Sequence, residues 1–94
     1  MTVANFVSKK PYSGENVEIL EAAMEENGFH SQFFLTYKQA KEGGFQVRKG
    51  ESGFTIIRVV VIEEVDKKTG KKRIVKRPKY FTVFNLNQCD KVEA

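Results

Sequence analysis

Two long runs of strand-forming residues, joined by a short turn, constrain the fold more than any other feature of this chain. Residues 54–65 are dense in isoleucine and valine, residues 66–70 have the composition of a turn, and residues 71–85 return with further β-branched and aromatic side chains. This pattern predicts a β-hairpin. A strand of 12 residues at about 3.3 Å per residue reaches about 40 Å, so the tip of the hairpin should project or curl. Pro78 cannot donate a ladder hydrogen bond, which predicts an edge position, a bulge or a break in the return strand.

A helix is predicted over residues 15–27, ahead of the hairpin. Four of its apolar residues recur at the spacing of one buried stripe, namely Ile19, Leu20, Ala23 and Met24. Acidic residues in the first turn suit the positive end of the helix dipole. Gly28 then provides a favourable left-handed end.

A second, shorter helix is predicted to begin at a capping box. Thr36 stands three residues before Gln39, so the hydroxyl and the amide satisfy each other's free backbone donors. The helix should end at residues 43–44, which are both glycine. A helix this short depends on packing, which we expect through Phe33, Leu35 and Ala40. Residues 45–48 then predict a short strand.

Together these elements predict the α+β class, with two helices packed on one face of a twisted antiparallel sheet that contains the long hairpin. The 94 residues have the usual size of one domain. We expect residues 1–94 to form a single domain, with an N-terminal arm at residues 1–11 and the main folded region at residues 12–89. Residues 54–65 are apolar on both faces of the strand, which leaves open a homodimer interface or a covered second face.

The residue types that catalysis needs are almost absent from the sequence. The chain has one histidine, His30, and one cysteine, Cys89, which lies beside Asp90 without a basic activator. Metal hydrolases, Ser/Cys-His triads and zinc deaminases need more than this. No Walker loop, HExxH, CxxC or dinucleotide-binding motif occurs. We therefore expect no enzyme activity, no catalytic residue, no metal site and no cofactor.

Signals for export and membrane insertion are also missing. The first 16 residues lack the apolar stretch of a signal peptide. The longest uninterrupted apolar run, residues 59–62, is far shorter than the roughly 20 residues that span a bilayer. A single cysteine excludes an internal disulfide. We expect a cytoplasmic protein that makes no membrane contact.

Charge is segregated along the chain, and basic residues are interleaved with aromatic ones. The predicted first helix holds five glutamates and no basic residue, whereas residues 67–79 hold eight basic residues and no acidic one. Such a field steers a polyanion towards one face. Lysine or arginine alternates with aromatic rings at residues 9–12, 33–41 and 77–81. Proteins that bind single strands combine cations for phosphates with exposed rings on which bases stack, so the pattern favours unpaired nucleic acid. The alternative for the basic run is a solvated hairpin kept soluble by its lysines.

Four blocks of residues occur in order along the chain: Tyr12-Ser13-Gly14-x-Asn16, Phe34-Leu35-Thr36-Tyr37-Lys38-Gln39-Ala40-Lys41, Gly44-x-x-Val47-Arg48-Lys49-Gly50 and Val83-Phe84-Asn85-x-x-Gln88. Together they resemble the N-terminal domain of the ArdC/TraC-type antirestriction proteins of bacterial plasmids, over residues 12–89. The resemblance implies an α+β unit that binds single-stranded DNA and serves antirestriction on a plasmid or phage. In that family a zinc metallopeptidase-like domain usually follows. The sequence has no counterpart of it, so we expect no protease activity.

The resemblance and the interleaving together give ten candidate nucleic-acid-binding residues. Tyr12, Tyr37 and Tyr80 are the candidate stacking rings, and we expect Tyr80 to keep its hydroxyl in water while Phe81 or Phe84 is buried. The candidate phosphate contacts are Lys38, Lys41, Arg48, Lys49, Lys76, Arg77 and Lys79. We expect binding to tolerate any base sequence, with single-stranded DNA as the partner and RNA not excluded.

A second function class stays open from the sequence alone. The chain could be a small protein-interaction or inhibitor module whose β-hairpin docks onto the sheet edge of a partner. The accessibility of the three tyrosines separates the two classes. If all three rings are buried, the interaction module is favoured.

Overall fold

The computed structural model describes residues 2–92, so the first residue of the predicted arm and the last two residues of the chain lie outside the described part. Its main sheet has four strands in the order β1-β2-β5-β4. These strands span Ala4–Asn5 (β1), Phe33–Thr36 (β2), Phe54–Val65 (β4) and Lys72–Asn85 (β5). The predicted α+β class is confirmed.

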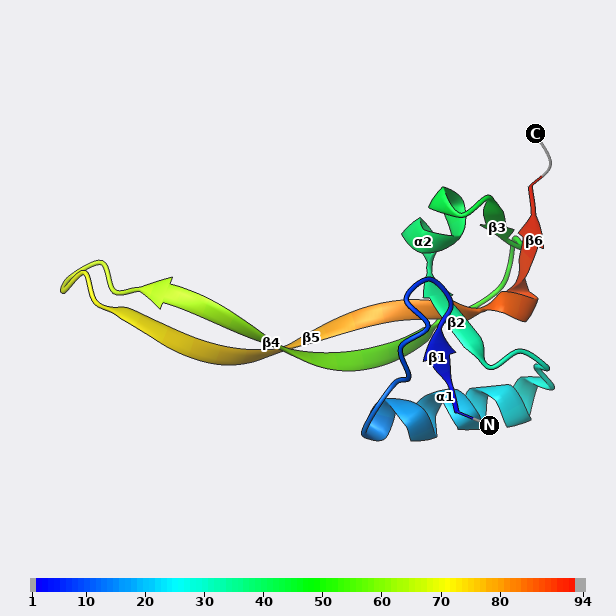
Figure 1. Cartoon of the computed structure of the whole chain (residues 1–94), viewed down its shortest axis with the longest axis horizontal. Coiled ribbons are helices and arrows are strands. Elements are labelled where there is room, and N and C mark those ends of the chain that lie inside the picture. Colours follow the sequence, from blue (N-terminus) through cyan, green and yellow to red (C-terminus); the bar gives the residue numbers. More distant parts are fainter. Residues whose placement is uncertain (1, 93–94) are drawn as a thin grey trace.

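The predicted hairpin is present as β4 and β5, and it projects far from the rest of the molecule (Figure 1). Its register is continuous, from Phe54 opposite Val83 to Val65 opposite Lys72. The molecule is 53 Å long with a radius of gyration of 16.7 Å, against about 12 Å for a compact chain of this length. Pro78 lies opposite Val59 without a bulge. Because β2 pairs only with residues 83–85 of β5, Pro78 occupies a free edge, which is one of the three expected positions.

The N-terminal arm is part of the sheet rather than a separate extension. Strand β1 pairs in parallel with β2, with Ala4 opposite Phe33, so the expectation of a purely antiparallel sheet is wrong at this edge. Parallel neighbours require a crossover connection, and α1, at Glu15–Asn27, supplies it. This pairing places Val3 in the core with no exposed surface.

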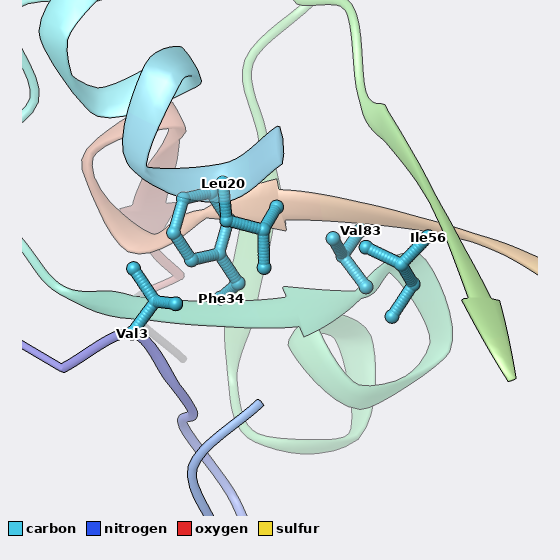
Figure 2. Packing of buried hydrophobic residues seen from close by; sticks show 5 residues of the cluster. All are labelled: Val3, Leu20, Phe34, Ile56 and Val83. Atoms are coloured by element: carbon cyan, nitrogen blue, oxygen red, sulfur yellow. The ribbon is translucent and has the colours of Figure 1, made fainter. Parts of the chain in front are cut away.

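Helix α1 has the predicted bounds and covers one face of the sheet. Its Leu20 packs with Val3, Phe34, Ile56 and Val83 in the main core cluster (Figure 2). Gly28 ends the helix in the left-handed region at φ 66°, as predicted. The predicted buried stripe is wrong for Ile19, which is 36% exposed. The other three residues of the stripe are covered: Leu20 and Ala23 are buried, and Met24 packs against the cluster.

Helix α2, at Tyr37–Glu42, begins at the predicted capping box of Thr36 and Gln39. Leu35 and Ala40 pack together in a second cluster, as expected, but this cluster lies on the other side of the sheet. The reason is the alternation of side chains along β2: Phe34 points to the α1 cluster and its neighbour Leu35 to the α2 cluster. The two helices therefore cover opposite faces (Figure 1), and the expectation that both pack on one face is wrong.

A small second sheet completes the fold. Strand β3, at Phe45–Val47, pairs antiparallel with β6, at Cys89–Lys91. A single 3₁₀ turn at Leu86–Gln88 separates β6 from β5 and is capped by the Asn85 side chain. Within residues 2–92, no helix combines the length and the apolar character needed to cross a membrane.

Candidate nucleic-acid interface

A groove lies where the N-terminal arm crosses the α1 face of the sheet, beyond the end of β2. We call it the arm groove. Its volume is about 570 Å³, within the range of sites for one small ligand. The residues that line it include an aromatic pair, two cations and several amides and hydroxyls: Asn5, Ser8, Lys10, Pro11, Tyr12, Ser13, Asn16, Thr36, Gln39, Ile56, Arg58, Phe81 and Val83.

The arm groove exists because β2 leaves the sheet early. Thr36 pairs with Val83 and the chain then turns into α2, so in the described part of the chain no strand pairs with that side of β5 beyond Val83. Residues 10–12 run beside β1, where Pro11 bridges Ala4 and the Tyr12 N–H donates to the Val3 carbonyl at 3.0 Å, and they line the groove. The Asn5 side chain shapes the turn that precedes this segment, because it accepts from the backbone N–H groups of Val7 and Ser8 at 2.9 and 3.0 Å. The Asn5 N–H then donates to the Lys10 carbonyl at 3.0 Å.

The groove opens onto one face of the projecting hairpin. Ile56 and Phe81 belong to the α1 cluster, so alternation places every second residue of both strands on the same face. Beyond the groove this face carries Arg58 opposite Lys79, and then Arg77 and Arg73. We call these four residues the cationic face. Lys79 Nζ lies 5.6 Å from the centre of the Phe81 ring, which joins the cationic face to the groove.

One acidic residue lies among these cations. Glu64 contacts Arg77 at 2.6 Å and Arg73 at 3.5 Å. The hydrogen bond from Arg77 is the main reason that the pKa of Glu64 lies below its usual value, with Arg73 adding to it. Glu64 therefore stays ionised and orients the two guanidinium groups, while Arg58 and Lys79 lie nearer the groove.

Tyr12 is the predicted ring that the structure brings into the groove. It is half-buried against the α1 cluster, and its hydroxyl accepts a hydrogen bond from Asn5 Nδ2 at 3.4 Å. Burial raises the pKa of Tyr12, and this hydrogen bond opposes the rise. The phenol is neutral at physiological pH, so its ring is available for stacking without a charge that repels phosphate.

The other two predicted rings lie elsewhere. Tyr37 is 58% exposed and lines a second pocket of about 470 Å³ together with Lys41 and Phe45. Tyr80 is 63% exposed, and by alternation it shares the α2 face with Phe84. The three tyrosines are therefore divided between the two faces, but they are not all buried, so the condition that favours the interaction module is not met. Neither Phe81 nor Phe84 is fully buried, because each packs half-exposed against a different face.

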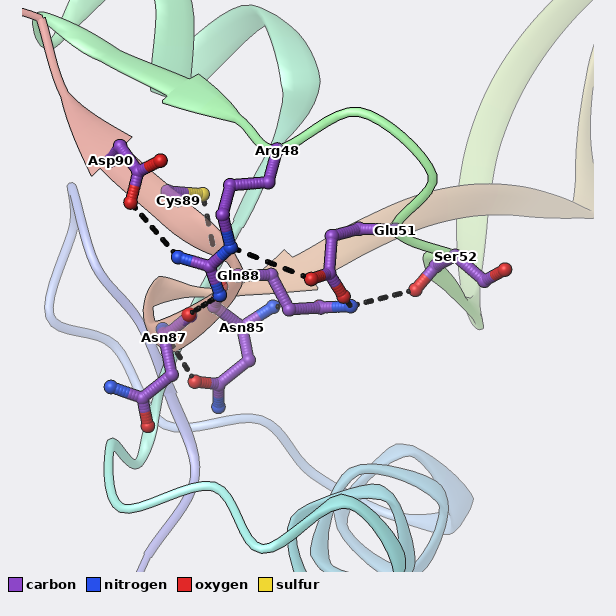
Figure 3. A network of polar contacts seen from close by, with 8 residues as sticks. All are labelled: Arg48, Glu51, Ser52, Asn85, Asn87, Gln88, Cys89 and Asp90. Carbon is purple, nitrogen blue, oxygen red and sulfur yellow. Dashed lines mark hydrogen bonds and ion pairs between the residues drawn. The ribbon is translucent and has the colours of Figure 1, made fainter.

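Arg48 is tied into a network of its own chain (Figure 3). Its guanidinium donates to Asp90 Oδ1 at 2.9 Å and to the Asn87 carbonyl, and it lies 3.5 Å from Glu51. The hydrogen bond to Asp90 is the first cause of the raised pKa of Arg48. These contacts join β3 to β6 and leave the guanidinium already satisfied, so its geometry favours a structural role over a phosphate contact.

The remaining predicted cations are exposed but dispersed. Lys38 lies on α2, and Lys49 lies in the turn after β3. Lys76 lies opposite Val61 on the hairpin face that points away from the arm groove. Of the ten predicted residues, the structure gathers Tyr12, Lys79 and Arg77 along the groove and the cationic face.

Tyr12 is the one groove residue in the predicted set, and the two cations of the groove and its second ring were outside it. Lys10 was part of the basic-aromatic segment at residues 9–12, so its signal was present. Arg58 is the only charged residue between Phe54 and Ile62, and a lone arginine in an apolar strand was the signal that could have revealed it. Phe81 was one of two rings, with Phe84, of which one was expected to be buried, and it is half-buried at the groove wall.

Within the described part of the chain, no three His, Cys, Asp or Glu side chains lie close enough together to hold a metal ion. The Cys89 thiol has a raised pKa, chiefly because of burial, and its Sγ lies 3.7 Å from the Asn85 carbonyl. The groove supplies aromatic surface, hydrogen-bonding groups and positive charge, and these groups suit it to hold an anionic ligand that carries a ring.

Comparisons with known proteins agree with the sequence resemblance. The model of the N-terminal domain of the anti-restriction factor ArdC matches residues 1–84. The metal-free crystal structure of the antirestriction ArdC protein from the R388 plasmid is 38% identical with a TM-score of 0.91, over 99% of this chain and 34% of that one. Its Mn(II)-bound structure is 36% identical with a TM-score of 0.79, over 98% of this chain and 35% of that one.

This chain thus spans about a third of the length of the R388 protein. A comparison with curated proteins gave no match. The family model covers most of the chain, and the structural match extends over nearly all of it. The resemblance seen in the four sequence blocks is therefore confirmed: the chain belongs to the family of N-terminal domains of the ArdC antirestriction factors.

Proposed function

We propose that this domain binds single-stranded DNA through the arm groove and the cationic face, and that this binding serves antirestriction. The observation that carries the proposal is the continuity of the two surfaces. Tyr12 and Phe81 line a groove whose open side leads directly to Arg58, Lys79, Arg77 and Arg73 along the hairpin.

The chemistry of this surface favours an unpaired strand. Bases in a duplex are stacked on one another, so a ring in a groove reaches them only when the strand is single. Successive residues on one face of a strand lie about 6.6 Å apart, so the cationic face presents its charges as a row that a flexible polyanion can follow. The groove has the volume of one small ligand, which corresponds to one stacked nucleotide rather than a duplex.

Binding in this proposal involves no chemical step, and it tolerates any base sequence. With four or five phosphate contacts, drawn from Lys10 and the cationic face, the slope of log K against log salt is about −3, from about −0.7 per contact on a single strand. Stacking adds about 1–3 kcal/mol per base. The whole antirestriction activity of a longer protein would use this domain as its DNA-holding part.

Fluorescence anisotropy with labelled oligo-dT, oligo-rU and a duplex, over a range of salt concentrations, tests the proposal. We expect oligo-dT to bind more tightly than the duplex. The double variant Lys10→Ala/Lys79→Ala should reduce the magnitude of the salt slope by about 1.4, because two contacts are lost. The matched control Lys38→Ala/Lys49→Ala removes two exposed lysines outside the groove and should leave the slope nearly unchanged.

Three results would count against this function. Equal affinity for duplex and single strand would remove the stacking argument. An equal loss in the control variant would show that general charge, not the groove, holds the DNA. Tighter binding of oligo-rU than of oligo-dT would assign the surface to RNA.

A further inference from the structure

The projecting hairpin has two open edges, and only one of them is suited to pairing with another strand. Strand β4 lies at the end of the strand order, so within residues 2–92 no strand pairs with its outer edge, and none pairs with the other edge of β5 between Lys72 and Thr82. Exposed strand edges pair with other chains unless proline, lysine or a bulge prevents it. Residues 54–65 of β4 contain no proline and no lysine.

The Asn16 side chain shows which backbone groups of β4 point outward. Its Nδ2 donates to the Ile57 carbonyl at 2.7 Å, and the Ile57 N–H donates to its Oδ1 at 2.9 Å. Asn16 thus closes the edge at Ile57 as a neighbouring strand would. Because outward-pointing groups recur at every second residue, the N–H and C=O groups of residues 59, 61, 63 and 65 also point outward, and within residues 2–92 they have no hydrogen-bond partner.

The edge of β5 is blocked by contrast. Tyr80 lies opposite Ile57, so its backbone groups point away from β4, and those of every second residue do the same. Pro78 is one of these residues and has no N–H to offer. The absence of that donor interrupts the free edge of β5 near its middle, whereas β4 is continuous from Val59 to Val65.

We propose that β4 pairs antiparallel with β4 of a second copy of this chain, about a two-fold axis at Ile62. This register sets Val59 opposite Val65 and Val61 opposite Glu63 of the second copy. The register pairs all of residues 59–65 and stops before Ile57, whose outward backbone groups are bonded to Asn16. No other two-fold register uses all four outward-pointing residues without displacing Asn16.

Charge along the strand selects a second copy and the antiparallel direction. Strand β4 carries Arg58 near its base, and Glu63 and Glu64 near its tip, with Asp66 just beyond. Glu63 and Glu64 already pair with Lys72, Arg73 and Arg77 of their own hairpin. The antiparallel register sets Arg58 opposite Asp66 of the second copy, whereas in-register parallel pairing would set Arg58 beside Arg58 and Glu63 beside Glu63. The apolar side chains of the pair, Val59, Val61 and Val65, are between 57% and 65% exposed in the single chain, and pairing covers part of each.

The interface is a short pair of strands, which is below the size of a permanent dimer. We therefore expect a dimer that forms as concentration rises through the micromolar range. The proposal does not depend on DNA binding, because the contact needs neither the groove nor a ligand, and its tests are made without DNA.

Sedimentation velocity over increasing protein concentration, combined with cross-linking, tests the proposal. Val61→Pro removes one outward N–H from the edge and should abolish the concentration-dependent dimer, whereas the matched Val61→Thr variant keeps the backbone donor and should retain it. Circular dichroism and a melting curve check that Val61→Pro is folded.

Cysteine cross-linking tests the register without weakening the edge. In a Cys89→Ser background, Ile62→Cys lies opposite itself in a non-hydrogen-bonded pair, where Cβ atoms are about 4.5–5.5 Å apart, so an oxidised dimer should form readily. Ile74→Cys, which lies on β5 and is also exposed, should form little. A monomer at all concentrations, or cross-linking that is equal at the two positions, would overturn the proposal.

Discussion

Replacement of Asn16 by alanine is expected to destabilise the domain more than its position on the surface of α1 would predict. The Asn16 amide makes two hydrogen bonds to the backbone of Ile57, 41 residues away in the sequence, at 2.7 and 2.9 Å. They fasten the first turn of α1 to the outer edge of β4. Alanine keeps the helix but removes both bonds.

The magnitude follows from these two contacts. A net contribution of about 1 kcal/mol per hydrogen bond gives a loss of about 2 kcal/mol. The Ile57 N–H and carbonyl lie at a sheet edge, where water can take the place of the Asn16 amide. The larger free-energy cost of leaving a buried polar group without a hydrogen bond is therefore not expected. A loss of 2 kcal/mol in a domain of this size lowers the melting temperature by about 8–16 °C.

Urea unfolding followed by circular dichroism measures the loss, because the chain has no tryptophan to report by fluorescence. Asn27→Ala is the matched control. Its Nδ2 donates one hydrogen bond to the Ala23 carbonyl, within α1, and alanine regains some helix propensity, so its cost should be below about 0.5 kcal/mol. If Asn16→Ala costs no more than this control, the edge contact does not stabilise the fold and the reasoning is refuted.

Three further predictions concern the base of the hairpin and the small sheet. Gly53→Ala should lower the free energy of unfolding by about 1–3 kcal/mol, because its new Cβ would overlap the Thr82 methyl group and lie 3.1 Å from the Phe84 ring; a variant as stable as the parent in urea would contradict this. Gln88→Leu should cost about 2–4 kcal/mol in the same assay, since the side chain is 3% exposed and bonds the last backbone N–H of β5 and the Ser52 carbonyl. Burial raises the pKa of Cys89, so at pH 8 iodoacetamide should alkylate Cys89 more slowly in the folded protein than in the urea-unfolded chain. The alkylation rate of the folded protein should rise with pH, because the thiolate is the nucleophile. Equal rates in the folded and unfolded protein would contradict this prediction.

The local pattern of the sequence was sufficient for the elements that dominate the fold. The hairpin, the bounds of α1, the left-handed Gly28 and the capping box at Thr36 each depend on residues close together in the chain, so their signals are local. The family could also be recognised from the sequence, because each of its four blocks is a stretch of neighbouring residues. The length of β4 predicted a tip that projects or curls, and the structure shows that it projects.

Tertiary structure decided the elements that are too short to carry a pattern. Strand β2 has four residues and was missed, because what makes it a strand is its position between β1 and β5. Strand β6 has three residues and exists only as the partner of β3. The alternation of Phe34 and Leu35 then sends one helix to each face, which no property of either helix predicts.

The candidate site shows the same division. Sequence alone supplied the residue types that the proposed function uses, and two of its candidates, Tyr12 and Lys79, lie at the groove and beside its Phe81 wall. Arg58 stood out in the sequence as a lone arginine in an apolar strand, but its pairing with Lys79, 21 positions away, comes only from the register of β4 and β5. Sequence alone also could not foresee that Arg48 would be satisfied by Asp90 of another strand. Local sequence thus determined which basic and aromatic groups the chain carries, and long-range pairing decided which of them lie together and which are tied to other groups of the chain.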